Sequence, residues 1–285
     1  MDADRQAYLD DVERWRSGRL NGLVGPRGWL TVIVLEWLRP GTNPIGSDPS
    51  NRILLPGKAP PHVGSIDLEA GRVVGRFLPE AGVTAGGTPV TTIELRDDTE
   101  GAPTVLELGP LSFSVIRRLD DWAVRVRDRD HPARRSFPGI EHWPVDPRWR
   151  IEARFDPNDP VPTVVVPTLL STGDRYELPG TLRFSIDRQS CSLIAFHEAG
   201  YRDYLVVFAD ETTGRETYGG GRFVYVPPPD EHGRTVIDFN RAYNPPCVFT
   251  PYATCPVPPP ENRLPVRVEA GEKRYTGLES GEQGR

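Results

Sequence analysis

The sequence is poor in cysteine and methionine, and it has no long apolar segment. Three of its 285 residues are Cys and one is Met. The most apolar run, Trp29–Leu38, is about half of the roughly 20 residues that a membrane-spanning helix needs. The first 15 residues are acidic and lack the apolar core of a secretory signal. We therefore expect a cytoplasmic protein without a membrane partner, in which the odd number of cysteines remain thiols.

A basic surface is also missing. The chain has 34 basic and 40 acidic residues, which gives a formal net charge of −6. The arginine-rich stretch Arg117–Arg135 alternates with aspartates, which is typical of a solvated face. Because nucleic-acid binding requires a positive surface, we expect no nucleic-acid partner.

Glycine and proline are abundant instead. The chain has 28 Gly and 31 Pro, and proline is at about twice its usual share. Both residues interrupt helices, which excludes a helical bundle or a coiled coil. Hydrophobic residues at 37% argue against general disorder. We therefore predict a mainly β protein with many turns.

The N-terminus is the exception to this β pattern. Tyr8, Val12 and Trp15 follow each other at helical spacing, which predicts a helix whose apolar stripe packs on the protein or on a second copy. From Gly28 onward, short apolar runs alternate with turn residues at a spacing typical of sandwiches and barrels. Trp29–Leu38, Arg72–Phe77, Val105–Leu108 and Val266–Ala270 are among the segments that we expect to form strands.

A compositional change marks a domain boundary. All six Trp lie at or before Trp149, all three Cys lie after it, and the segment His131–Asp146 is rich in turn residues. We expect an N-terminal helix (1–20), a β-sandwich (21–130), a second β-rich domain (131–275) built as an antiparallel sandwich or barrel, and a disordered polar tail (276–285). The segment His142–Arg150 combines aromatics, Arg and Pro, and we interpret it as an interdomain clasp or the roof of a pocket.

The first half resembles a forkhead-associated domain through the runs GSDPSNRILLP, AGVTAGGTPV and LELGPLSFSVIRR. The resemblance implies a β-sandwich that reads phosphothreonine. Ser47 stands where that family has its phosphate-binding Arg, and Gly86–Gly87 replace its Asn-Gly turn. Without the guanidinium there is no bidentate phosphate clamp unless Arg52 replaces it. A structural sandwich is our main interpretation, and a phosphopeptide adaptor is an alternative.

Three motifs of the second half, FADETTGRETYGGGRF, DFNRAYNPPC and TCPVPPPENRLPVRVEAGEK, closely resemble the family called domain of unknown function 1684. The likeness extends upstream to WLTVIVLEWLRPGTNPIGSDPSN and HPARRSFPGIEHWPVDPRWRIEARF, so that it covers most of the chain. The resemblance implies a shared fold and site, and it names no substrate.

The same motifs supply the candidate site. Three glycines between Tyr218 and Arg222 predict a tight turn, or a turn whose amides face an anionic ligand. A half-buried Asp238 would need a cation, and Arg222 is a plausible partner. We predict a pocket for a small polar or anionic ligand, lined by Thr217, Asn240, Asn244, Cys247 and Cys255, with Asp210, Tyr218, Arg222 and Asp238 as candidate catalytic residues.

Two further questions stay open at this stage. The cysteines Cys247 and Cys255 lie in a proline-stiffened loop and are buried thiols, a redox pair or metal ligands, although their spacing is unlike that of structural zinc sites. If the pocket is catalytic, an Asp would act as general base, Arg222 as anion stabiliser and Tyr218 as proton donor, as in a hydrolase or lyase. We expect no cofactor and no bound metal, and the oligomeric state is left open.

Overall fold

The computed structural model describes residues 2–99, 101–170 and 173–277, and the chain divides into two compact units. One unit is Leu23–Ser136, and the other combines the segments Met1–Gly22 and Phe137–Arg285. The content is 40% strand and 16% helix, which confirms the predicted mainly β fold with an N-terminal helix. No helix of the described residues is long and apolar enough to cross a bilayer.

The unit Leu23–Ser136 is built from two sheets. One has the strand order β1 (Val32–Trp37), β11 (Asp121–Asp128), β10 (Leu111–Arg118), β9 (Val105–Leu108), β6 (Thr84–Ala85) and β7 (Thr88–Pro89). The other has the order β3 (Ile53–Leu54), β2 (Gly41–Gly46), β4 (Gly64–Glu69), β5 (Arg72–Phe77) and β8 (Thr92–Glu94). All pairings are antiparallel except the parallel pair β2–β3. The unit also holds the short helices η1 (Trp29–Thr31), η2 (Pro79–Ala81) and α2 (Ala133–Ser136).

The two sheets of this unit share one core. Ile45 and Ile66 from the second sheet belong to the same buried cluster as Phe113, Val115 and Val124 from the first. Alternate residues of β10 face this core, as the period of a half-buried strand requires. The arrangement is that of a β-sandwich.

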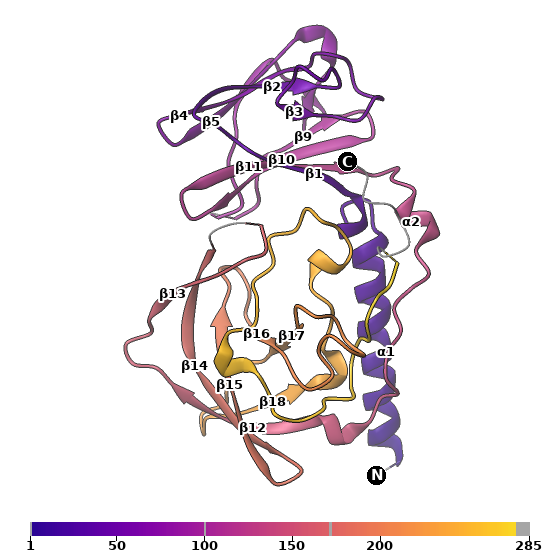
Figure 1. The fold of residues 1–285 in the computed structure, drawn as a ribbon, viewed down its shortest axis with the longest axis vertical. Coiled ribbons are helices and arrows are strands. Elements are labelled where there is room, and N and C mark those ends of the chain that lie inside the picture. Colours follow the sequence, from indigo (N-terminus) through magenta and orange to yellow (C-terminus); the bar gives the residue numbers. More distant parts are fainter. Residues whose placement is uncertain (1, 100, 171–172, 278–285) are drawn as a thin grey trace. The chain divides into compact units, whose positions relative to one another are not determined.

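The long helix α1 (Asp2–Val24) contributes nearly all of its length to the second unit. Val12 has no exposed surface, and the Trp15 ring lies 6.3 Å from the ring of Tyr243. The Tyr8 hydroxyl donates a 2.8 Å hydrogen bond to Asp238. The apolar stripe that the sequence predicted therefore packs on the C-terminal part of the chain, and Figure 1 shows α1 running along one side of that unit.

A seven-stranded antiparallel sheet forms the body of this unit. Its order is β17 (Arg222–Val226), β16 (Tyr204–Phe208), β15 (Gln189–His197), β14 (Asp174–Ile186), β12 (Arg150–Pro157) and β18 (Arg234–Asp238), with β13 (Thr163–Val166) paired to β14. The short helices η3 (Pro147–Trp149), η4 (Phe239–Arg241), η5 (Pro246–Val248) and η6 (Pro260–Asn262) lie in the connections. Phe239 lies in the core of this unit, and its ring centroid is 6.0 Å from that of Phe184 and 5.3 Å from that of Phe208. Irregular chain after β18 closes one side of the unit (Figure 1).

Two expected strands differ from the structure. Val266–Ala270 is not a strand, because its backbone groups bond to buried side chains described below. The expected strand Trp29–Leu38 begins with the helical turn η1, in which the Thr31 hydroxyl bonds back to the Gly28 carbonyl, and only then continues as β1. The polar tail expected at 276–285 lies outside the described residues from position 278 onward.

Candidate functional site

Asp210 and Arg222 form an ion pair that is completely buried. Their Oδ2 and Nη2 atoms lie 3.4 Å apart, and neither side chain has exposed surface. Arg222 also donates to the carbonyl of Val268 at 2.9 Å and to that of Ala270, while Asp210 accepts the Val268 amide at 2.6 Å. The pair therefore ties the segment 268–270 into the core. Burial lowers the pKa of Arg222, and the adjacent carboxylate opposes this shift.

Thr217 is joined to the same pair indirectly. The Thr212 hydroxyl bonds both the Asp210 carboxylate, at 2.8 Å, and the Thr217 hydroxyl, at 2.9 Å. All three side chains are buried. The Asp210 carboxylate thus makes its hydrogen bonds with groups of the protein itself, which is typical of a structural cross-link.

The triple glycine is a tight turn that packs closely on its surroundings. The Gly221 amide donates to the Tyr218 carbonyl at 3.1 Å, and Gly221 has a φ of +83°. A Cβ at Gly221 would lie 2.5 Å from the Phe208 carbonyl oxygen and 2.5 Å from Pro258 Cγ. Of the two interpretations of this motif, the structure therefore favours the tight turn, and Arg222 behind it faces the core.

Tyr218 and the two cysteines of the proline-rich loop form a second group. The Cys247 amide donates to Cys255 Sγ at 3.2 Å, and Cys247 Sγ lies 3.8 Å from the Tyr218 hydroxyl. Cys191, Cys247 and Cys255 are all thiols in this structure. No cluster of three or more metal-ligating side chains occurs in the described part of the chain.

Asp238 and Asn240 form a third group, with α1. Asp238 accepts from the Tyr8 hydroxyl at 2.8 Å and pairs with Arg241 at 3.1 Å. The Asn240 amide donates to Tyr8 at 2.9 Å and to the Asp146 carbonyl at 2.8 Å. Burial and the Asp238 carboxylate both raise the pKa of Tyr8. The cation partner of Asp238 is therefore Arg241, whereas Arg222 pairs with Asp210.

Asn244 belongs to a fourth group, around the buried Glu272. The Glu272 carboxylate accepts a hydrogen bond from the backbone amide of Asn244 at 2.6 Å. It also pairs with Arg19 of α1 at 3.1 Å. Arg19 Nη2 also donates to the Asn244 carbonyl at 2.7 Å. Burial raises the pKa of Glu272, and the Arg19 guanidinium opposes the shift. The nine residues predicted as one site thus lie in four hydrogen-bonded groups, of which the first and the fourth are joined by a 3.5 Å hydrogen bond from Arg222 to the Glu272 carbonyl.

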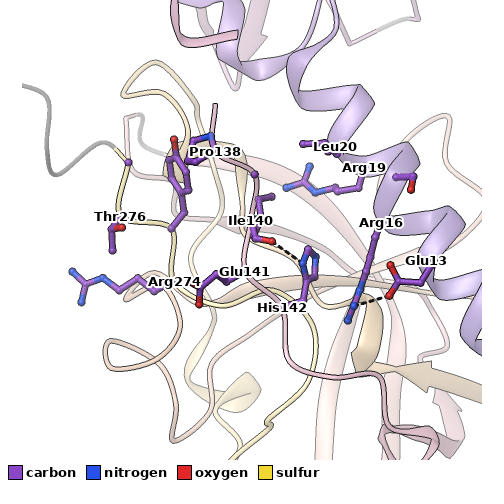
Figure 2. Close-up of a pocket in the computed structure, with 14 residues that line it drawn as sticks. Glu13, Arg16, Arg19, Leu20, Pro138, Ile140, Glu141, His142, Arg274 and Thr276 are labelled. Atoms are coloured by element: carbon purple, nitrogen blue, oxygen red, sulfur yellow. Dashed lines mark hydrogen bonds and ion pairs between the residues drawn. The ribbon is translucent and has the colours of Figure 1, made fainter. Parts of the chain in front are cut away.

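A pocket of about 700 Å³ lies elsewhere in this unit, and none of those nine residues lines it. It opens between α1, the segment after Phe137 and the chain beyond Lys273 (Figure 2). Its lining residues are Glu13, Arg16, Ser17, Arg19, Leu20, Pro138, Gly139, Ile140, Glu141, His142, Arg274, Tyr275, Thr276 and Gly277. The candidate site is therefore assembled from three stretches that are far apart in sequence.

Helix α1 presents two arginines to this pocket at a spacing of three residues, which places them on one helix face. Arg16 pairs with Glu13 at 2.9 Å and donates to the Trp143 carbonyl at 2.9 Å. The guanidinium of Arg19 lies 4.5 Å from the centre of the Tyr243 ring. Both side chains are thus held in place by several contacts, which gives the pocket a pre-formed positive wall.

His142 lies between these arginines and the opposite wall. Its Nδ1 is 2.9 Å from the Ile140 carbonyl, which fixes Nδ1 as the protonated donor and leaves Nε2 as an acceptor (Figure 2). Burial lowers the pKa of His142 to about 4, and the charges of Arg16 and Arg19 contribute. The side chain is therefore a neutral imidazole at physiological pH. Its Nε2 is buried without a hydrogen-bond partner among the described residues.

The sequence did not predict Arg16 and Arg19 as site residues, but it did single out the segment that begins at His142. Arg16 and Arg19 lie on the packed face of α1 that also carries Val12 and Trp15, although a charged residue in a helix sequence looks like ordinary solvated surface. His142 begins the segment interpreted as a clasp or a pocket roof, and it does line the pocket. The available signal was two arginines one helical turn apart on a helix expected to pack against the protein.

Two residues of the sandwich unit bear on the missing phosphate clamp, and both have internal partners. Ser47 stands at the position of the family's Arg, and Arg52 is the side chain that could replace it. Arg52 pairs with Glu36 at 2.8 Å and donates to the Trp37 carbonyl at 2.7 Å. The Ser47 hydroxyl donates to the Ala59 carbonyl at 2.8 Å. This arrangement does not favour a phosphopeptide adaptor.

Together, the fold and the pocket define a mainly β protein with a cavity of small-molecule size. Residues 135–273 match the family model described as "Protein of unknown function (DUF1684)", so this part of the chain belongs to that family. The motifs of the second half predicted this, whereas the expected upstream motif at 29–51 lies outside the matched residues. Among curated proteins, none matches the chain. The family segment includes His142 and ends one residue before Arg274.

Two solved structures are similar to parts of the chain. One is the solution NMR structure of an uncharacterized protein of Haloarcula marismortui, 33% identical, with a TM-score of 0.42, over 49% of this chain and 78% of that one. The other comes from a study titled as an analysis of phosphothreonine-dependent forkhead-associated domain interactions. It is 21% identical, with a TM-score of 0.24, over 34% of this chain and 96% of that one.

Proposed function

We propose that this protein is a cytoplasmic binding protein whose pocket beside α1 takes a small anionic ligand. The distribution of charge supports this. Arg16 and Arg19 have only 13% and 15% of their side-chain surface exposed, whereas Glu13 and Glu141 have 60% and 82%. The two guanidinium groups therefore lie inside the pocket, where Glu13 pairs with Arg16 and the buried Glu272 pairs with Arg19, while Glu141 extends into solvent at the rim. We infer that a small anion can bind beside these two guanidinium groups.

The observation that carries the proposal is a pair of unused polar atoms. Arg16 Nε is a buried donor without an acceptor, and His142 Nε2 is a buried acceptor without a donor, among the described residues. Leaving such groups unpaired costs about 1–3 kcal/mol each. A ligand with an anionic oxygen and a hydroxyl would satisfy both atoms. The volume of the pocket lies within the usual range for small-molecule sites.

The ligand class that fits is a hydroxycarboxylate or the phosphate ester of a small alcohol. Isothermal titration calorimetry with malate, glycerol phosphate and glycerol tests it. We expect both anions to bind and the uncharged glycerol to show no heat of binding. Added salt weakens binding, because screening acts on the charged part of the interaction.

Two variants sharpen this experiment. Arg16→Gln removes a cation of the pocket wall and should weaken anion binding about tenfold or more. Arg14→Gln is the matched control, because Arg14 lies on the same helix with 71% of its side chain exposed, outside the pocket. Equal affinities of the two variants, or an absence of anion binding to the native protein, would contradict the proposal.

A further inference from the structure

The pair Cys247 and Cys255 forms a second site, separate from the arginine-lined pocket. Cys255 is buried, with 4% of its surface exposed, whereas Cys247 is only partly buried. The Cys247 amide donates to the Cys255 sulfur at 3.2 Å. One partly exposed cysteine thus lies directly against one buried cysteine.

The proline-rich loop holds this pair in place. Cys247 lies in the turn η5, which begins at Pro246, and Pro245 before it has an extended backbone with a φ of −63°. On the far side of Cys255, Pro258 packs so closely on the glycine turn that a Cβ at Gly221 would come within 2.5 Å of it. Because proline fixes φ, both flanks of the pair have little freedom to move apart.

Tyr218 completes the site from the other side. The glycine turn holds its hydroxyl 3.8 Å from Cys247 Sγ, and the close contact of Gly220 with the Tyr218 ring leaves no room for a side chain there. The hydrogen bond from Cys255, followed by that from Tyr218, lowers the pKa of Cys247, while burial opposes the shift. A thiolate at Cys247 is the form that both neighbours stabilise.

We propose that Cys247 and Cys255 are a redox-active pair that hydroperoxides oxidise to a disulfide. The Cys247 sulfur attacks the terminal oxygen of the hydroperoxide, the O–O bond breaks, and Cys247 becomes a sulfenic acid while an alcohol or water leaves with the thiol proton. The Cys255 sulfur then attacks the sulfenic sulfur, which forms the S–S bond and releases water. Two thiols and one hydroperoxide thus give one disulfide, one water and one alcohol (or a second water). A small dithiol restores the starting state by exchange.

Peptide mass spectrometry of the full chain, treated with hydrogen peroxide and quenched with N-ethylmaleimide, tests this proposal. We expect a single internal disulfide between Cys247 and Cys255, with a mass loss of about 2 Da that dithiothreitol reverses. In Cys255→Ser the reaction should stop at a sulfenic acid on Cys247, which dimedone traps. Tyr218→Phe should slow the oxidation several-fold, because the thiolate loses a donor.

Cys191 is the internal control. It is buried, and burial raises its pKa, so we expect its oxidation to be at least about tenfold slower. Oxidation of Cys191 at the rate of Cys247 would overturn the proposal, as would direct conversion of Cys247 to a sulfinic acid in the native chain. Near-UV circular dichroism checks that each variant is folded. If Cys255→Ser does not fold, the disulfide measurement on the native chain alone tests the proposal.

Discussion

Arg222 shows how one buried charge can organise a stretch of chain that has no strand partner. Its guanidinium bonds the carbonyls of Val268 and Ala270, and it pairs with Asp210. A β-ladder would have offered the same backbone groups to a neighbouring strand. The sequence pattern of Val266–Ala270 resembles a strand because the segment is buried, although side chains, and not a strand, satisfy its backbone.

Replacing this arginine should therefore destabilise the protein strongly. Arg222→Met leaves the Asp210 carboxylate buried without its cation, and we expect the free energy of unfolding to fall by about 3–5 kcal/mol in urea titrations. The matched control is Arg154→Met, since Arg154 forms an exposed pair with Asp156 at 3.4 Å and its loss should change stability by less than about 1 kcal/mol. Similar effects of both substitutions would contradict the structural role of the buried pair.

His142 makes the stability of the protein depend on pH. Its pKa is about 4 in the folded chain, compared with an ordinary value of 6.5. The unfolded chain therefore binds the proton first, so stability is lost as the pH falls from about 6.5 to about 4. We expect the urea midpoint of His142→Gln to fall less steeply than that of the native protein over this range. His232→Gln, at an exposed histidine outside the pocket, is the matched control.

The pocket ligand should keep His142 neutral. The proposed ligand hydroxyl donates to Nε2, which needs the unprotonated ring, and the charges of Arg16 and Arg19 also disfavour the charged imidazole. The other charged groups that line the pocket are Glu13, Glu141 and Arg274, and the buried Glu272 lies behind Arg19. Binding at pH 6 should accordingly take up no proton at His142, which calorimetry in two buffers of different ionisation enthalpy measures; proton uptake would contradict this contact.

At the scale of elements, the glycine turn at Gly221 leaves little room for a side chain. Gly221→Ala must adopt a positive φ and also approach the Phe208 carbonyl oxygen within 2.5 Å. We expect a loss of about 1–3 kcal/mol from the backbone conformation, with a further loss from the collision. Gly219→Ala is the neighbouring control, because its Cβ would meet nothing closer than 3.9 Å. Thermal unfolding of both variants measures the difference, and a similar loss of stability in the two would contradict the argument.

The elements also show what the sequence could predict. Hydrophobic periodicity located α1 and predicted strands such as β5 and β9 with the bounds that the structure has. It missed β2 and β4, which contain Gly41, Pro44 and Gly64 and so look like turns. Local patterns identify elements well when their burial alternates, and less well when packing tolerates turn residues inside a strand.

The candidate site was harder to predict, for a physical reason. The motif residues Asp210, Arg222 and Asp238 attract attention as charges within apolar surroundings, and the structure pairs each of them internally. The pocket depends on which face of α1 packs against residues beyond Phe137. That contact is long-range, and no spacing within one stretch of sequence encodes it.

At the scale of the whole molecule, the two units differ in how the chain builds them. Leu23–Ser136 is continuous and has a buried core of its own, so it should fold as an isolated fragment. We expect the fragment 23–136 to give a β-type circular dichroism spectrum and a cooperative thermal transition. A spectrum of unordered chain would contradict this. The remainder without its first 22 residues should be less stable than the full chain, because it lacks Tyr8, Val12 and Arg19.

The unit that combines residues 1–22 and 137–285 can complete its fold only after its second segment has been synthesised. The ribosome delivers α1 before the whole of the other unit, yet partners of α1 such as Asp238 and Glu272 come only after that unit. At elongation rates of about 5–20 residues per second this delay is on the order of ten seconds. During that time the nascent helix presents Val12 and Trp15 without their partners, while Leu23–Ser136 can complete its own core. Chaperones that recognise exposed apolar helices should therefore contact the nascent chain mainly through its first 22 residues, and release them once the C-terminal strands have emerged.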